Sequence, residues 1–192
     1  MGGDQAFLYG YTPSEALHDN PCSAGQNMLF SMDEDGDMTH RFATYFGAQL
    51  LTQEWTMPAG GWHELYPAVS NVRNRKAEQL VTAYAVHRPD GLWSLLLINK
   101  DPDRAYRVRV RFETQGRRSP STLTGALDIY QYSPAQYALN EDKDNPFPVK
   151  ADPPLHVILQ DDPARVMELP AYSITVVRGH GPPVGSIRPN RD

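Results

Sequence analysis

The sequence has one cysteine among its 192 residues, Cys22, which excludes an internal disulfide framework and a cysteine-based zinc pattern. No apolar run approaches the roughly 20 residues that a membrane-spanning helix needs. The first residues also lack the basic and apolar regions of a signal peptide. A net charge of −5 argues against a nucleic-acid-binding surface, which is normally basic. We therefore expect neither a membrane span nor a nucleic-acid partner.

Catalytic and cofactor motifs are also missing. The sequence contains no serine nucleophile elbow, no phosphate-cradling glycine loop and no dinucleotide fingerprint. Cys22 could act as a nucleophile beside one of the six histidines, but no family signature surrounds it. We interpret it as a structural thiol, and we expect no cofactor.

An acidic run at residues 33–37 invites a calcium hypothesis, because Ca²⁺ prefers carboxylate oxygens. If Gly36 is aligned with the glycine of an EF-hand loop, Phe42 falls where the loop requires a bidentate glutamate. The motif therefore fails, and the run is better interpreted as an acidic turn that leads into a helix. The sequence predicts no metal site.

Glycosidic or acyl chemistry would need an acid and a base or nucleophile in one cleft. The glutamates that qualify by residue type alone are Glu54, Glu64, Glu78 and Glu113. Each lies beside the end or start of an expected helix or strand, in no recognisable catalytic neighbourhood. No catalytic residue is therefore predicted in this chain.

Residues 1–62 have the pattern of an α/β segment. Two short apolar runs, at residues 6–11 and 27–31, predict buried strands. The period then becomes helical over residues 38–53, with Asp37 as the expected N-cap. A strand, a turn and an amphipathic helix in succession are typical of an α/β layer.

The helix has an apolar stripe formed by Phe42, Tyr45, Phe46 and Leu50. Monomeric proteins rarely expose a patch of this kind. We therefore expect the isolated chain to self-associate, or to pack this helix back onto the rest of the molecule.

Residues 63–179 predict an antiparallel β-sandwich, because turns separate the strands and no helix intervenes. The fold class is thus mainly β. The expected strands are 63–69, 78–87, 92–99, 106–112, 123–131, 155–159, 166–169 and 169–178. Residues 140–154 are interpreted as a surface loop, and residues 180–192 as a disordered tail.

Three strands have informative patterns. Residues 92–99 are apolar almost throughout and follow an x-P-D-G turn, so we expect a central strand covered on both faces. In residues 106–112, Tyr106, Val108, Val110 and Phe112 alternate with three arginines, which we place on a solvated face rather than in a polyanion site. Residues 169–178 alternate too, which predicts a half-buried strand.

Several aromatic side chains could stack on sugar rings, although such residues are equally often part of a core or an interdomain contact. They are Trp55, Trp62, Tyr66, Tyr130, Tyr132 and Tyr137.

Residues 43–55 (ATYFGAQLLTQEW), 81–85 (VTAYA), 95–100 (LLLINK) and 169–176 (LPAYSITV) resemble the C-terminal portion of clan-A-type bacterial glycoside hydrolases. In these enzymes a (β/α)8 barrel is followed by a β-sandwich. The resemblance covers residues 6–178, approximately. It implies that residues 1–62 are the end of a barrel and that the sandwich lacks a strand contributed from upstream.

The resemblance implies that the catalytic carboxylates lie upstream of Met1, so none can be assigned in this chain. It places Tyr9, Tyr11 and Glu15 at the rim of the substrate cleft. Together with the ring-stacking candidates Trp62 and Tyr132, they form the expected substrate-binding set.

Two functions follow from these observations. The first is a non-catalytic C-terminal part of a glycoside hydrolase, supporting a barrel that hydrolyses glycosidic bonds in polysaccharide or oligosaccharide. The alternative is a self-contained carbohydrate-binding or structural β-sandwich. A small enzyme using Glu64 or Glu78 is a third hypothesis, which their surroundings disfavour. The expected partners are carbohydrate and the missing barrel, and the resemblance implies a secreted or periplasmic parent.

Overall fold

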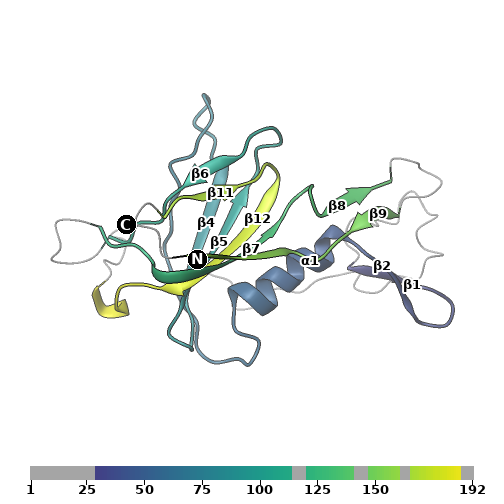
Figure 1. Ribbon diagram of the computed structural model, residues 1–192, viewed down its shortest axis with the longest axis horizontal. Helices are drawn as coiled ribbons and strands as arrows, with labels where there is room; N and C mark the ends of the chain where they lie inside the picture. The colour runs from purple at the N-terminus through teal and green to yellow at the C-terminus, as the bar shows by residue number, and fades with distance from the viewer. Residues whose placement is uncertain (1–28, 114–119, 141–146, 161–164, 187–192) are drawn as a thin grey trace. The chain divides into compact units, whose positions relative to one another are not determined.

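The computed structural model describes residues 29–113, 120–140, 147–160 and 165–186. The chain divides into two compact units, one of Met1–Ala48 with Ala135–Pro153 and one of Gln49–Pro134 with Pro154–Asp192. The fold is mainly β with antiparallel pairing, which confirms the predicted fold class (Figure 1). The expected strand at residues 6–11, Cys22 and residues 187–192 of the expected tail lie outside the described residues. The domain boundaries expected from the sequence stay predictions.

The described part of the first unit begins with a hairpin of β1 (Phe30–Met32) and β2 (Met38–Arg41). Its turn is held by the carboxylate of Asp33, which accepts hydrogen bonds from the backbone N–H groups of Asp35 and Asp37 at 3.1 and 2.8 Å. Helix α1 (Ala43–Gln49) follows. The expected helix start at residue 38 is wrong, because residues 38–41 pair with β1, and Asp37 is therefore not the N-cap.

The first unit also contains a second hairpin, formed by β8 (Tyr137–Leu139) and β9 (Pro148–Ala151). The prediction of a surface loop over residues 140–154 is therefore wrong for β9, whose short length and Pro148 start conceal the strand. Phe147 stacks on His40 with ring centres 4.3 Å apart. Burial raises the pKa of Tyr137, and a hydrogen bond with the backbone of Ala43 opposes that shift.

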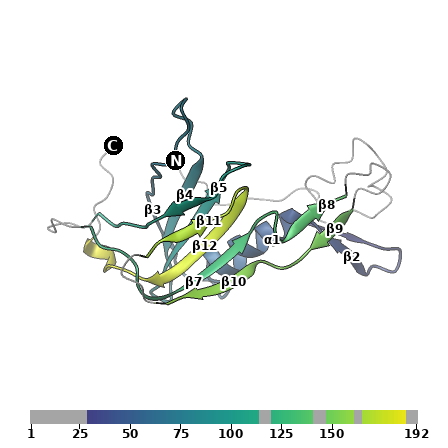
Figure 2. The same ribbon diagram turned by 45° about the horizontal axis from the view of Figure 1, so that its top comes forward.

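The second unit contains a six-stranded antiparallel sheet in the order β10-β7-β12-β5-β4-β3 (Figures 1 and 2). Its strands are β3 (Glu64–Tyr66), β4 (Val81–His87), β5 (Trp93–Asn99), β7 (Thr124–Tyr132), β10 (Leu155–Leu159) and β12 (Ser173–His180). A shorter ribbon of β6 (Tyr106–Val108) and β11 (Met167–Leu169) lies over one face. A short 3₁₀ helix, η4 (Val184–Ser186), follows β12.

The hydrophobic core lies between the sheet and the β6–β11 ribbon. Trp93 is 1% exposed, and its ring contacts the rings of Tyr66, His87 and Phe112 at 4.8 to 5.2 Å. Its indole N–H donates to the carbonyl of Pro182 at 3.0 Å. Residues 180–186 therefore follow a fixed path along the core, and the prediction of a disordered tail is wrong for them.

Strand β5 is buried on both faces, as its apolar sequence predicts. Strand β12 is fully buried on its core side and partly exposed on its outer side, as expected of a half-buried strand, but its polar residues occupy the buried side. Small polar residues fit this position: Ser173 and Thr175 point to the core side and are buried. The strand begins at Ser173 because Tyr172 has a φ of 46° and belongs to the preceding turn.

The end of β5 is fixed by the side chains of Asn99 and Asp101. Asn99 donates to the carbonyls of Arg104 and Pro170 at 2.8 and 2.7 Å and accepts from the N–H of Asp101 at 3.0 Å. The hydrogen bond from the Tyr106 hydroxyl, with two from backbone N–H groups, lowers the pKa of Asp101. The same hydrogen bond raises the pKa of Tyr106.

A π-helical segment, η3 (Leu50–Trp55), lies against β12 and β5 on the face of the sheet opposite the core. Leu50 is fully buried there. In the first unit, Phe42 and Phe46 are buried as well. Three of the four residues of the apolar stripe are thus buried and Tyr45 is half-buried, and self-association stays a prediction. No helix in the described part of the chain is long and apolar enough to cross a membrane.

Candidate functional site

A groove of about 1430 Å³ lies between the six-stranded sheet and the β6–β11 ribbon. Apolar side chains form its floor, among them Val81, Leu95 and Leu97. Glu113 is the one carboxylate among the described residues that line it. Glycoside hydrolysis uses a pair of carboxyl groups, and the described lining of the groove contains one.

The arginines at the rim of this groove belong to an exposed face. Val108 and Val110 pack against the core, while Arg107, Arg109 and Arg111 alternate with them and are exposed. This confirms the predicted orientation of residues 106–112.

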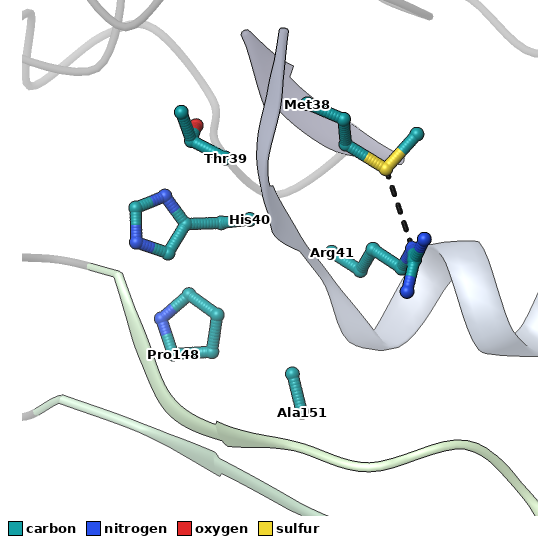
Figure 3. A pocket seen from close by; sticks show the side chains of 6 residues that line it. All are labelled: Met38, Thr39, His40, Arg41, Pro148 and Ala151. Carbon is teal, nitrogen blue, oxygen red and sulfur yellow. Dashed lines mark hydrogen bonds between the residues drawn. The ribbon is translucent and has the colours of Figure 1, made fainter. Parts of the chain in front are cut away.

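A smaller hollow of about 230 Å³ lies in the first unit (Figure 3). It is lined by Met38, Thr39, His40, Arg41, Pro148 and Ala151, and the guanidinium of Arg41 contacts the sulfur of Met38 at 3.3 Å. His40 Nδ1 lies 3.1 Å from the hydroxyl oxygen of Ser31. Ser31 is completely buried, so its hydroxyl is out of a substrate's reach. We interpret this serine–histidine pair as part of the hairpin's packing.

Three of the four candidate glutamates have partners close to them in the fold. Glu54 pairs with Arg178 at 3.1 Å, Glu64 accepts a hydrogen bond from the Tyr66 hydroxyl at 2.9 Å, and Glu78 accepts one from the Asn74 amide. Burial raises the pKa of Tyr66, and the bond to Glu64 adds to the shift. Within the described ranges, no group of three or more His, Cys, Asp and Glu side chains could hold a metal ion.

Trp62 is 92% exposed on a loop with a defined conformation. His63 holds this loop: its Nε2 accepts from the N–H of Met57 at 2.8 Å, and its Nδ1 lies 3.1 Å from the carbonyl of Gly61. Gly61 has a φ of 102°, and a Cβ there would lie 2.7 Å from Pro89. The loop thus requires glycine at this position, and it presents the Trp62 ring to solvent.

The five expected substrate-binding residues do not form one described site. The exposure that the sequence suggests for Tyr132 is wrong, because this residue is only 6% exposed and its strand lies inside the sheet. Tyr9, Tyr11 and Glu15 lie outside the described residues. Trp62 alone is described and exposed, and its role in binding stays a prediction.

The outer face of the sheet carries a cluster that the sequence did not reveal. Arg178 on β12 pairs with Glu54 of η3 at 3.1 Å, and its guanidinium lies 4.6 Å from the ring centre of Tyr130. The Tyr130 ring stacks on His156 at 4.2 Å, and His156 Nε2 lies 2.9 Å from Asp128. Burial raises the pKa of Tyr130, whereas the charge of Arg178 acts against the shift.

Arg88 makes a second link between the sheet and η3. It is buried in the x-P-D-G turn, whose Gly91 has a φ of 81°. Its guanidinium donates to the carbonyl of Glu54 at 2.7 Å and pairs with Asp90 at 2.8 Å. Burial acts to raise the pKa of Asp90, but the hydrogen bonds from Arg88 and the N–H of Leu92 lower it overall. The side chain thus binds a carbonyl at the end of η3, where helices leave such groups unpaired.

The motif at residues 88–91 predicts the turn. It does not predict that Arg88 binds the carbonyl of Glu54, because Glu54 lies 34 positions earlier and leaves no signal in the local sequence. The same holds for Arg178, which follows the alternation of an ordinary strand. The presence of an arginine in the otherwise apolar or small-residue strand β12 is the one hint of a partner for its charge.

No family model matches the sequence, and no curated protein shows significant similarity to it. Searches of solved structures find glycoside hydrolases. A GH51 α-L-arabinofuranosidase from Thermotoga petrophila RKU-1 is 16% identical over 53% of this chain and 19% of its own, with a TM-score of 0.34. A GH51 arabinofuranosidase from Xanthomonas axonopodis pv. citri is 17% identical over 60% and 21%, also with a TM-score of 0.34.

A GH44 xyloglucanase from Paenibacillus polymyxa is 12% identical over 53% of this chain and 16% of its own, with a TM-score of 0.31. The chain thus spans about a fifth of the length of these enzymes or less.

Proposed function

We propose that this chain is a non-catalytic C-terminal part of a bacterial glycoside hydrolase, a β-sandwich that supports a catalytic barrel located before it in the sequence. The observation that carries the proposal is the attachment of η3 to the outer face of the sheet. Leu50 is buried there, Arg178 pairs with Glu54, and Arg88 binds the carbonyl of Glu54. The segment that leads into the sandwich is thus packed against it, unlike the exposed, flexible linker that separates independent modules.

Exposed apolar side chains on the outer face of the sheet support a contact between this face and a further domain. Leu65 of β3 and Tyr84 of β4 are exposed, and Tyr84 contacts the half-buried Trp55 of η3 edge to face at 6.4 Å between ring centres. Leu51 of η3 is exposed as well. A surface of this composition is suited to packing against another domain.

The composition of the described groove is consistent with a supporting role. Glu113 has no second carboxylate beside it among the groove residues, whereas glycosidases use two. The chemistry would then come from carboxylates of the barrel, which in such barrels lie at the C-terminal ends of strands.

One observation favours the alternative of a carbohydrate-binding module. Trp62 is held by its loop with an open ring face, which is the arrangement that stacking on a sugar requires. In the supporting role, the same ring would contact the barrel.

Two experiments separate these functions. In the genome, we expect a barrel-coding frame continuous with the codon of Met1. A stop codon shortly before Met1, with no such frame, would contradict the supporting role. In calorimetry with xyloglucan, arabinan and xylan, we expect no binding heat from the purified chain. In a reducing-sugar assay with the same polysaccharides, we expect the chain to release no sugar.

Binding that is lost in Trp62→Ala and kept in Trp62→Phe would instead establish the module. Any hydrolysis by the purified chain that disappears in Glu113→Gln or Glu64→Gln would contradict a non-catalytic role.

A further inference from the structure

Strand β10 ends the six-stranded sheet with an open edge. It pairs with β7 in one unbroken register from Leu155 opposite Gln131 to Leu159 opposite Leu127, with no bulge. Its other side pairs with no described strand, and Figure 2 shows it outside β7. An edge of this kind presents unpaired backbone N–H and C=O groups that can pair with another strand.

The sequence of β10 has none of the features that usually protect an edge. It reads Leu-His-Val-Ile-Leu, without a proline, lysine or acidic residue. Leu155, Val157 and Ile158 are 47%, 41% and 56% exposed.

The opposite edge of the same sheet is different. Strand β3 is three residues long and begins with Glu64. A short strand with a charge resists pairing. The two edges therefore differ in their capacity to accept a partner.

We propose that β10 pairs antiparallel with β10 of a second copy of this chain, about a two-fold axis at Val157. In this register Val157 lies opposite its own copy, Leu155 lies opposite Leu159, and His156 lies opposite Ile158. Leu155, Val157 and Leu159 of both chains then cover each other on the core side, and the open edges become one continuous sheet.

A second copy fits this edge better than a charged peptide. The strand is apolar on both faces, so its copy matches it on both, and no Lys, Arg, Asp or Glu within it repels the same residue across the axis. The ring of His156 is held by its own chain, stacked on Tyr130 and 2.9 Å from Asp128. A charged peptide would find no complementary charge on the strand.

The size of the contact sets its strength. Five residue pairs form an interface below the roughly 1,200 Å² of stable complexes, so the dimer belongs to the weak, concentration-dependent class. Pro153 and Pro154 prevent the pairing from extending beyond Leu155 on one side, because proline cannot donate to a ladder.

Sedimentation velocity across a dilution series tests the pairing. We expect monomer at the dilute end of the series and dimer at the concentrated end, as a weak, concentration-dependent contact requires. Val157→Lys and Ile158→Lys place like charges at or beside the axis and should each keep the chain monomeric. The matched control Val69→Lys, at an exposed position outside β10, should dimerise as the wild type does.

Hydrogen exchange provides a readout that does not depend on a variant. Amides of β10 that face away from β7 should gain protection as the concentration rises, whereas the amides of β3 should not. A wild-type chain that remains monomeric throughout, or a dimer that survives both lysine variants with native circular dichroism, would overturn the proposal. A dimer whose formation leaves β10 exchange unchanged would also overturn it. None of these results depends on the proposed hydrolase role.

Discussion

The two faces of the six-stranded sheet are closed in different ways. On the inner face, Leu95, Leu97 and Val177 pack with the side chains under the β6–β11 ribbon, and the contacts are apolar. On the outer face, η3 is held by Arg178 and Arg88 through ionic and hydrogen-bonded contacts beside the buried Leu50. Apolar burial is non-directional, whereas a guanidinium bound to a carboxylate or carbonyl fixes an orientation. The inner face therefore supplies most of the stability, and the outer face determines how η3 lies against the sheet.

The inner face should be the most sensitive to truncation. Trp93→Ala removes a buried indole with three ring neighbours and a hydrogen bond, and we expect a loss of about 3–5 kcal/mol of unfolding free energy. The matched control is Trp62→Ala, at an exposed position, which should change stability by less than about 0.5 kcal/mol. Urea denaturation measures both. Equal losses in the two variants would mean that Trp93 is not the centre of the core.

The next largest loss of stability is expected at Asn99, the polar residue at the end of β5. Asn99→Asp keeps an acceptor for the N–H of Asp101 but removes the donors to the carbonyls of Arg104 and Pro170. We expect a loss of about 2 kcal/mol, because buried carbonyls are left unpaired. Thermal unfolding compares this variant with Asn71→Ala, at an exposed position, which should resemble the wild type. An Asn99→Asp variant as stable as the wild type would show that water replaces the hydrogen bonds of the amide without loss of stability.

On the outer face the expected effect is smaller. A double-mutant cycle of Arg178→Met and Glu54→Gln should give a coupling of about 1 kcal/mol, since the pair is only partly buried and water screens it. The coupling should fall when salt is raised. A coupling of zero at low salt would remove this ionic contribution and leave Leu50 and the hydrogen bond of Arg88 as the attachment of η3.

The smallest effect concerns pH. The pKa of Asp101 is lowered in the folded chain, so its contribution to stability is complete above the unfolded value near 3.9. This contribution is lost as the pH falls through the lowered pKa. Asp101→Asn should therefore flatten the acid limb of the stability curve and have no effect on its slope above about pH 5. A steeper acid limb in the variant would contradict the assignment.

Local patterns predicted the inner face well. The alternation of Tyr106, Val108 and Val110, and the apolar run of β5, depend on side chains of neighbouring residues, which a sequence displays directly. The buried Ser173 and Thr175 of β12 misled the prediction, since their polarity suggested a solvent-facing side.

Contacts between distant residues could not be predicted in the same way. Residues 38–41 have helical periodicity, yet their pairing with β1 overrides it. Tyr132 has an amphipathic side chain, and only the place of its strand inside the sheet buries it. The pair of Arg178 and Glu54 joins positions with no shared local pattern, so the outer face emerged only from the structure.

Hydrogen exchange of Arg178→Met tests the attachment of η3, on which the proposed supporting role depends. We predict faster exchange of the amides of η3, together with unchanged protection at the centres of β5 and β12, because the core face does not involve this arginine. Unchanged exchange in η3 would contradict this attachment, since Arg178 would then not hold η3 on the outer face. Equal acceleration throughout the sheet would contradict it as well, because the two faces would not be separable.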